Sequence, residues 1–123
     1  MIPVRDASQP VASQVDADAA RLEGNWRVVE GAGVVPGMAV EIGPESFSVA
    51  GVAQSLVSEG RGRFRVGGRA LWVHWLDADA RTAALGDPEG GWWMILDREG
   101  RPGERLAAAR TILDWYGYQR PGA

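Results

Sequence analysis

Short apolar runs interrupted by glycine fill the chain between Trp26 and Arg98, and they limit the folds that it can adopt. Seventeen of the 123 residues are glycine. Runs of this length, bounded by glycine, proline and aspartate, are typical of β-strands and turns. Gly67-Gly68 separates two of these runs by two residues, which is the spacing of a hairpin turn that needs positive φ. The sequence therefore predicts an antiparallel all-β domain.

The pattern predicts eight short strands and two helical segments in a single domain of residues 1–123. Strands are expected at residues 26–30, 38–42, 46–49, 53–58, 62–66, 71–76, 81–85 and 92–96. Residues 16–22 start with aspartate and predict one or two helical turns. Residues 104–116 have helical spacing, with Leu106, Ala109, Ile112 or Leu113, and Tyr116 on one face. Residues 1–15 lack apolar periodicity and are expected to form an extended strap.

Composition excludes several classes of function. The chain has no cysteine, which excludes disulfides, thiol catalysis and cysteine-based metal sites. Its net charge of -3 does not favour nucleic acid as a partner. No stretch approaches the roughly 20 apolar residues of a membrane-spanning helix. Nucleophile motifs, phosphate loops and metal-ligand spacings are absent from the sequence, which argues against an enzyme, and no cofactor or metal is expected.

Three short motifs and one longer segment resemble those of lipocalins. They are Gly24-Asn25-Trp26 before the first strand, the acidic turn Asp77-Ala78-Asp79, the arginine of Ile95-Leu96-Asp97-Arg98, and residues 106–118, which look like the helix of bacterial lipocalins. The resemblance implies an up-and-down β-barrel of about eight strands with the C-terminal helix packed on its outside. It also implies a structural kernel of Gly24, Trp26 and Arg98 at the closed end, with the Arg98 guanidinium stacked on the Trp26 indole.

Alternation along the strands assigns side chains to the interior of this barrel. If Trp26 and Arg98 face inward, alternate residues on their strands do so too, which places Glu30 and Leu96 inside. The resemblance at the acidic turn sets the facing of the strand at residues 71–76. The expected ligand-binding wall consists of Val28, Leu71, Val73, Trp75, Trp92 and Met94. The ligand is expected to be a small apolar molecule such as a fatty acid or lipid fragment. The apolar loop of residues 34–38 would be either a lid over the cavity or a plug that fills the barrel.

The same alternation predicts an apolar patch on the outside of the barrel, which residues 104–116 would bury. Its members are Trp72, His74, Leu76, Ala83, Leu85, Trp93 and Ile95. An outward His74 is expected to be a hydrogen-bonded packing residue rather than a haem or metal ligand. Asp77 and Asp79 are expected to accept backbone N–H groups in a turn rather than to form a catalytic pair.

Three functions are compatible with these residues. The first is a non-enzymatic carrier of a small apolar molecule. The second is a structural or interaction module with a filled barrel, in which Arg61, Arg63 and Arg65 share one strand face that is either solvated or bound to an anionic partner. The third is a haem or metal enzyme centred on an inward His74. A cavity on the order of several hundred Å3 favours the carrier over the filled module.

The family resemblance also implies a cellular setting. It points to the bacterial periplasm or outer membrane. It further implies peripheral membrane association through a lipoprotein signal that would have been removed from this chain.

Overall fold

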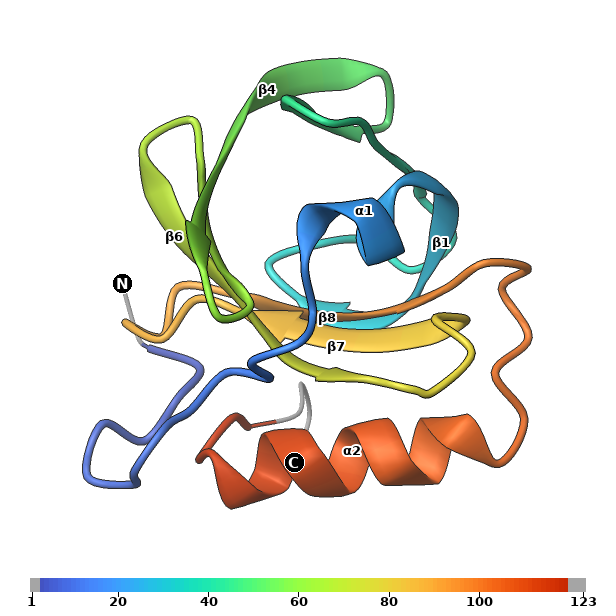
Figure 1. Ribbon diagram of the computed structural model, residues 1–123. Helices are drawn as coiled ribbons and strands as arrows, with labels where there is room; N and C mark the ends of the chain where they lie inside the picture. The colour runs from blue at the N-terminus through green and yellow to red at the C-terminus, as the bar shows by residue number, and fades with distance from the viewer. Residues whose placement is uncertain (1–2, 120–123) are drawn as a thin grey trace.

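Eight antiparallel strands close into a barrel in which each strand pairs with its neighbours in sequence and the last pairs with the first (Figure 1). The computed structural model describes residues 3–119. The strands are β1 (Gly24–Ala32), β2 (Ala39–Ile42), β3 (Ser46–Val49), β4 (Val52–Gly60), β5 (Arg63–Val66), β6 (Arg69–Leu76), β7 (Thr82–Gly86) and β8 (Trp93–Asp97). Two helices, α1 (Ala19–Leu22) and α2 (Arg105–Trp115), complete the fold. The predicted all-β up-and-down barrel with one C-terminal helix is confirmed.

The two ends of the barrel are built differently. At one end, which we call the closed end, α1 lies across the barrel in the view of Figure 1. The other end, the open end, carries the loop between β1 and β2 and the loop between β7 and β8. The turn at Gly67 and Gly68 also belongs to the open end. Its two residues have φ of 57° and 84°, as the predicted two-residue hairpin turn requires.

A β-bulge in β6 changes which of its side chains face the interior. Val73 pairs with Leu85, but Trp75 pairs with the adjacent Ala84, so one residue of β6 is extra. An extra residue reverses the alternation beyond it. Leu76 consequently packs in the interior cluster, whereas Trp75 packs in the cluster outside the barrel. The predictions of an inward Trp75 and an outward Leu76 are therefore wrong.

Three further residues, on β7 and β1, are assigned to the wrong face. Ala83 and Leu85 belong to the interior cluster, and Ala84 to the outer one. All five residues of β7 are buried, and Thr82 at its start is the only polar one, so exposure does not distinguish the two faces of the strand. A second bulge in β1, between Val28 and Glu30, turns Glu30 outward. There its carboxylate accepts a hydrogen bond of 2.9 Å from Nε of Arg110 on α2.

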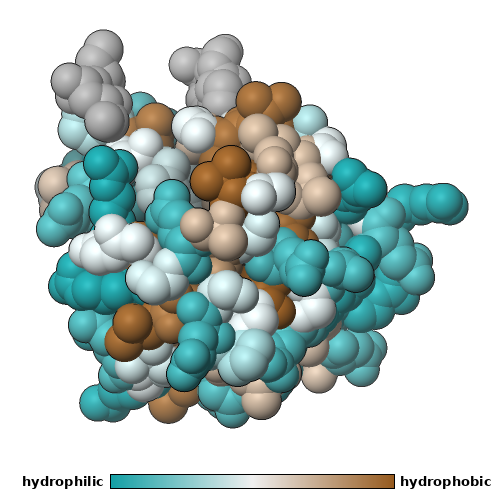
Figure 2. All heavy atoms as spheres, turned by 90° about the horizontal axis from the view of Figure 1, so that it is seen from above, coloured by the Kyte–Doolittle hydropathy of each residue, from teal (hydrophilic) through white to brown (hydrophobic). Residues whose placement is uncertain are grey.

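Helix α2 covers one side of the barrel and leaves the opposite side bare. Ala109 and Leu113 are buried against Trp93 and Ile95, which confirms that the helix buries the outer apolar face, with Ala84 in the place expected for Leu85. The β7 and β8 strands are buried along their whole length. In contrast, β4 has a single buried residue. Figure 2, which looks onto the side of β4, shows hydrophobic side chains at the surface among hydrophilic ones.

The N-terminal strap completes the wall beside β6. The expected strap of residues 1–15 is extended apart from a turn at residues 6–9, and its first two residues lie outside the described part. Strand β5 pairs only with the first half of β6, so the second half needs another partner. Gln14 supplies it: its N–H donates to the Val73 carbonyl (2.8 Å), and its side-chain amide bonds the N–H and carbonyl of Leu76 (2.9 and 3.1 Å). The strap thereby satisfies backbone groups that the barrel leaves open.

Candidate ligand-binding site

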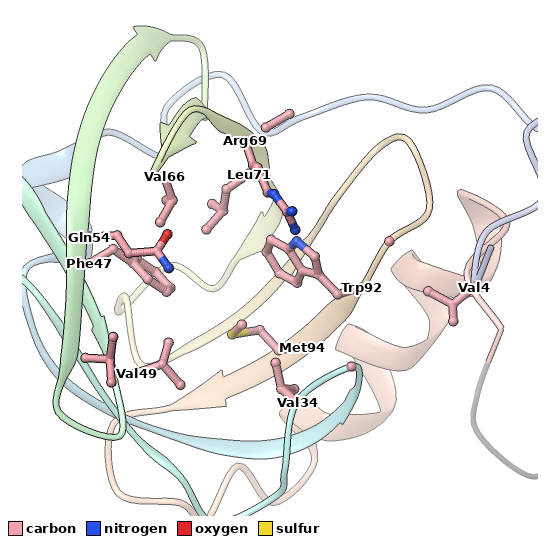
Figure 3. A pocket seen from close by; sticks show the side chains of 14 residues that line it. Val4, Val34, Phe47, Val49, Gln54, Val66, Arg69, Leu71, Trp92 and Met94 are labelled. Carbon is pink, nitrogen blue, oxygen red and sulfur yellow. The ribbon is translucent and has the colours of Figure 1, made fainter. Parts of the chain in front are cut away.

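The open end of the barrel leads into a cavity of about 590 Å3. This volume lies within the range of small-molecule sites, roughly 300 to 1,000 Å3. Figure 3 shows side chains from several strands directed into it. Its apolar side chains are Val4, Val34, Phe47, Val49, Val52, Val66, Ala70, Leu71, Trp92 and Met94. The cavity is therefore lined mainly by aliphatic and aromatic groups.

Half of the expected wall residues line this cavity. Leu71, Trp92 and Met94 do so. Val28 and Val73 also face the interior, but they are 2% and 0% exposed and belong to its packed part, so the prediction that they line the cavity is wrong. Trp75 lies outside the barrel because of the bulge in β6.

The closed half of the barrel is filled by large side chains. Leu22, Trp26, Phe64, Leu76 and Leu96 are all buried in the interior cluster. Close packing of this kind leaves no room for a ligand. The barrel thus combines the two arrangements that the sequence left open, with a solid core at the closed end and a cavity at the open end.

Sequence reasoning missed the part of the wall that comes from the short strands β3 and β5. Phe47 and Val49 of β3 and Val66 of β5 line the cavity. Their positions had a signal, because apolar residues alternate with serine in residues 46–49 and with arginine in residues 63–66. Alternation of this kind predicts one inward and one outward face.

The loop between β1 and β2 forms part of the cavity rim. Gly33 and Val34 line the cavity, and Val34 packs against the interior cluster. Gly31 permits this packing, because a Cβ atom at that position would collide with the Val34 side chain. Val35 is 60% exposed. The loop borders the cavity and does not plug it.

Two polar side chains stand at the rim. Of the fourteen described residues that line the cavity, Arg69 is the only charged one and Gln54 the only amide. Figure 3 shows the Arg69 guanidinium directed toward the Trp92 indole and the Gln54 amide directed into the cavity. The apolar pocket therefore has a polar, positively charged margin.

The Trp26 and Arg98 side chains are in contact at the closed end, as expected. The guanidinium carbon lies 3.7 Å from the centroid of the indole ring. Arg98 also donates to the backbone carbonyls of Arg21 (2.8 Å), Glu23 (2.6 Å) and Ala80 (3.0 Å). One side chain thus joins the segment around α1 to the turn between β6 and β7.

Leu22 and Gly24 complete this closed-end cluster. The Trp26 indole N–H donates to the Leu22 carbonyl at 2.8 Å. Gly24 has φ of 119°, and a Cβ atom there would lie 2.7 Å from Nη1 of Arg98. The glycine is needed both for its backbone conformation and for the close approach of the guanidinium.

His74 points outward and is buried beneath the strap. Its Nδ1 lies 2.6 Å from the Ala12 carbonyl and its Nε2 lies 2.8 Å from the Tyr118 hydroxyl. Burial lowers the pKa of His74 to about 4, against the opposing effect of the hydrogen bond to Ala12. A neutral ring suits these contacts, since Nδ1–H then donates to the carbonyl and Nε2 accepts from the hydroxyl. Within residues 3–119, no group of three or more histidine, cysteine, aspartate or glutamate side chains could hold a metal ion.

Asp77 acts within its turn, as expected. Its Oδ1 accepts the backbone N–H groups of Arg81 (2.6 Å) and Thr82 (2.8 Å), and its Oδ2 accepts Nε of Arg105 on α2 (2.9 Å). Burial works to raise the pKa of Asp77, but these hydrogen bonds outweigh it and lower the pKa. Asp79 is exposed, and the nearest approach of its carboxylate to Arg105 is 4.0 Å.

The expected row of three arginines on one strand face is only partly formed. Arg61 lies in the turn before β5, with φ of 63°. Arg63 stacks on Trp72, with 3.9 Å between the guanidinium carbon and the ring centroid. Arg65 pairs with Glu59 at 3.2 Å. These two cations are engaged within the chain and do not form a continuous basic face with Arg61.

Comparisons with known proteins leave the function to be argued from the structure. No protein-family model and no curated protein matches the sequence. Neither of the helices in residues 3–119 is long and apolar enough to span a membrane.

Proposed function

We propose that this protein is a non-enzymatic binding protein that carries a small apolar molecule in the open half of its barrel. The observation that supports this function most strongly is the cavity of about 590 Å3, with lining side chains that are mainly aliphatic and aromatic. An apolar molecule that moves from water into such a cavity gains about 25 cal/mol for each Å2 of apolar surface removed from water. The resemblance of the sequence to lipocalins supports the same function.

The chemistry of the lining supports binding rather than catalysis. The described lining residues offer one arginine and one glutamine, but no carboxylate, histidine or hydroxyl group. Acid–base and nucleophilic catalysis require such groups within reach of the substrate. His74 cannot serve from its position, because its ring packs outside the barrel against Tyr116 and Tyr118.

The neutral fluorescent probe N-phenyl-1-naphthylamine tests this proposal. We expect it to bind the purified protein and to be displaced by neutral apolar molecules such as decanol. Val66 and Val57 provide matched positions on neighbouring strands: Val66 lines the cavity, whereas Val57 is paired with the outward Arg65 and is 57% exposed. Val66→Trp should fill the cavity and weaken probe binding at least tenfold. Val57→Trp adds the same ring outside and should leave binding unchanged.

The outcome separates the carrier from the interaction module. Equal weakening by both substitutions, with both variants folded, would place the probe outside the cavity and contradict the proposal. Failure of the parent protein to bind the probe would also overturn it, and would leave the interaction module as the alternative.

A further inference from the structure

We propose that the natural ligand is an amphiphile with an anionic head group, which Arg69 and the indole N–H of Trp92 bind at the rim while the apolar tail occupies the cavity. This inference rests on the proposed function and adds the chemical class of the ligand and its orientation.

The register of the barrel places Arg69 on the inner side. Arg69 pairs directly with Val66, which in turn pairs with Leu56. Directly paired residues of an antiparallel sheet point to the same face, and both partners pack with the interior. Leu71 and Val73 continue this inward series along β6. The arginine is therefore the outermost member of a row of inward side chains and extends over the cavity (Figure 3).

The Arg69 guanidinium has no partner of its own within residues 3–119. It makes neither an ion pair nor a hydrogen bond there, and it is exposed at the rim. Arg65, on the adjacent strand β5, points outward and has two partners within the protein. It pairs with Glu59 and donates to the Gly68 carbonyl at 3.2 Å. Arg69 thus retains all its donors for a bound molecule.

The indole of Trp92 offers a second donor on the same side of the cavity. Two other indoles use their N–H groups within the protein, Trp26 toward Leu22 and Trp93 toward Gln119. The N–H of Trp92 has no acceptor in the described part of the chain, and Figure 3 shows its nitrogen facing the Arg69 guanidinium. A carboxylate placed between them would accept from both groups, and charge-assisted hydrogen bonds of this kind are stronger than neutral ones.

The charge at the rim is positive, opposite in sign to the net charge of the chain. The protein carries a net charge of -3, yet the charge among the described lining residues is a single positive one. An anionic head group is therefore attracted, a cationic one is repelled, and an uncharged one gains only hydrogen bonds.

A series of ten-carbon ligands tests the head-group site by displacement of N-phenyl-1-naphthylamine at pH 8 and low salt. We expect decanoate to bind about three- to tenfold more tightly than decanol, because an exposed ion pair contributes less than a buried one. Decylamine should bind most weakly. Added salt should weaken decanoate and leave decanol unchanged, because salt screens exposed charges.

Substitutions locate the effect. Arg69→Gln should remove the preference for decanoate and leave decanol binding intact, whereas Arg69→Lys should keep part of it because the charge remains. Arg101→Gln is the matched control, since Arg101 is exposed and follows β8 at the closed end. It removes the same charge far from the rim and should keep the preference.

The failures are distinguishable. Equal affinities for decanoate and decanol in the parent would overturn the head-group site and leave the carrier function in place. An equal effect of Arg101→Gln and Arg69→Gln would show that only the overall charge matters, and would also overturn the site. Failure of the neutral probe and decanol to bind would overturn both proposals.

Discussion

At each end of the barrel an arginine is associated with a tryptophan, and the two pairs differ in what surrounds them. At the closed end, Arg98 lies on the Trp26 ring and donates to three backbone carbonyls, and Trp26 is 1% exposed. At the open end, Arg69 is exposed without a partner among residues 3–119, and Trp92 is half-buried and lines the cavity.

The difference shows how the surroundings decide whether the donors of an arginine are used within the fold or left available. The chain around α1 brings carbonyl groups to Arg98 and so satisfies its donors within the fold. At the open end, no residue among 3–119 supplies an acceptor for the donors of Arg69. Donors that are satisfied internally stabilise the fold, whereas donors left open can contribute to ligand affinity and specificity.

The largest expected contrast is between the two tryptophans. Trp26→Ala should lower the free energy of unfolding by about 3 to 5 kcal/mol, as expected for a large buried aromatic residue. Trp92→Ala should cost less than half as much but weaken binding of the neutral probe. Urea unfolding and probe titration of both variants measure the two effects. Equal losses of stability would show that the open end is as tightly packed as the closed end.

A change of pH should affect stability without acting on either pair. The pKa of His74 is about 4 in the folded protein, against 6.5 for an unperturbed histidine. Below pH 6.5 the unfolded chain therefore binds a proton that the folded protein does not, and stability falls as the pH approaches 4, by about 3 kcal/mol in total. Urea unfolding between pH 7 and 4.5 measures this loss.

His74→Gln provides the control for that loss, because it removes the titrating group. Asp77 and Asp97, whose pKa values are lowered, contribute only at the acid end of this range. A similar slope in His74→Gln would contradict the assignment. Probe binding by the folded protein should stay constant from pH 7 to 5, since the imidazole faces away from the cavity.

The smallest expected contrast is between the two arginines. Arg98→Lys keeps the charge, but an ammonium group cannot reach three carbonyls and stack on the indole, so we expect a loss of about 2 kcal/mol. Arg69→Lys should change stability by less than about 0.5 kcal/mol, as for most surface substitutions. Chemical denaturation of both variants tests this. An unchanged free energy of unfolding in Arg98→Lys would show that the closed end does not depend on the guanidinium.

Local signals in the sequence predicted the elements of this barrel well. The two-glycine turn was correct, because its backbone conformation depends on the residues of the turn itself. The contact between Trp26 and Arg98, expected from family resemblance, is also present. The cavity wall was predicted less well: Leu71, Trp92 and Met94 were correctly placed, but Trp75 was not.

The errors in facing have two physical causes. Alternation predicts facing only while the register is regular, and a single extra residue in β6 exchanged the positions of Trp75 and Leu76. A bulge depends on how two strands pair, and its residues look like any others in an apolar run. Strand β7 shows a different problem, since both of its faces are buried and Thr82 is its only polar residue, so few polar positions distinguish the inner face from the outer one.

The sequence by itself determined the number and order of the strands, the covering helix and the residues of the closed-end pair, because these depend on local conformational preference and short motifs. Only the tertiary structure decided that the barrel is filled at one end and hollow at the other, and that Arg69 extends over the hollow end. Both properties depend on which side chains from distant strands meet across the barrel axis, and strand pairing and bulges set those meetings.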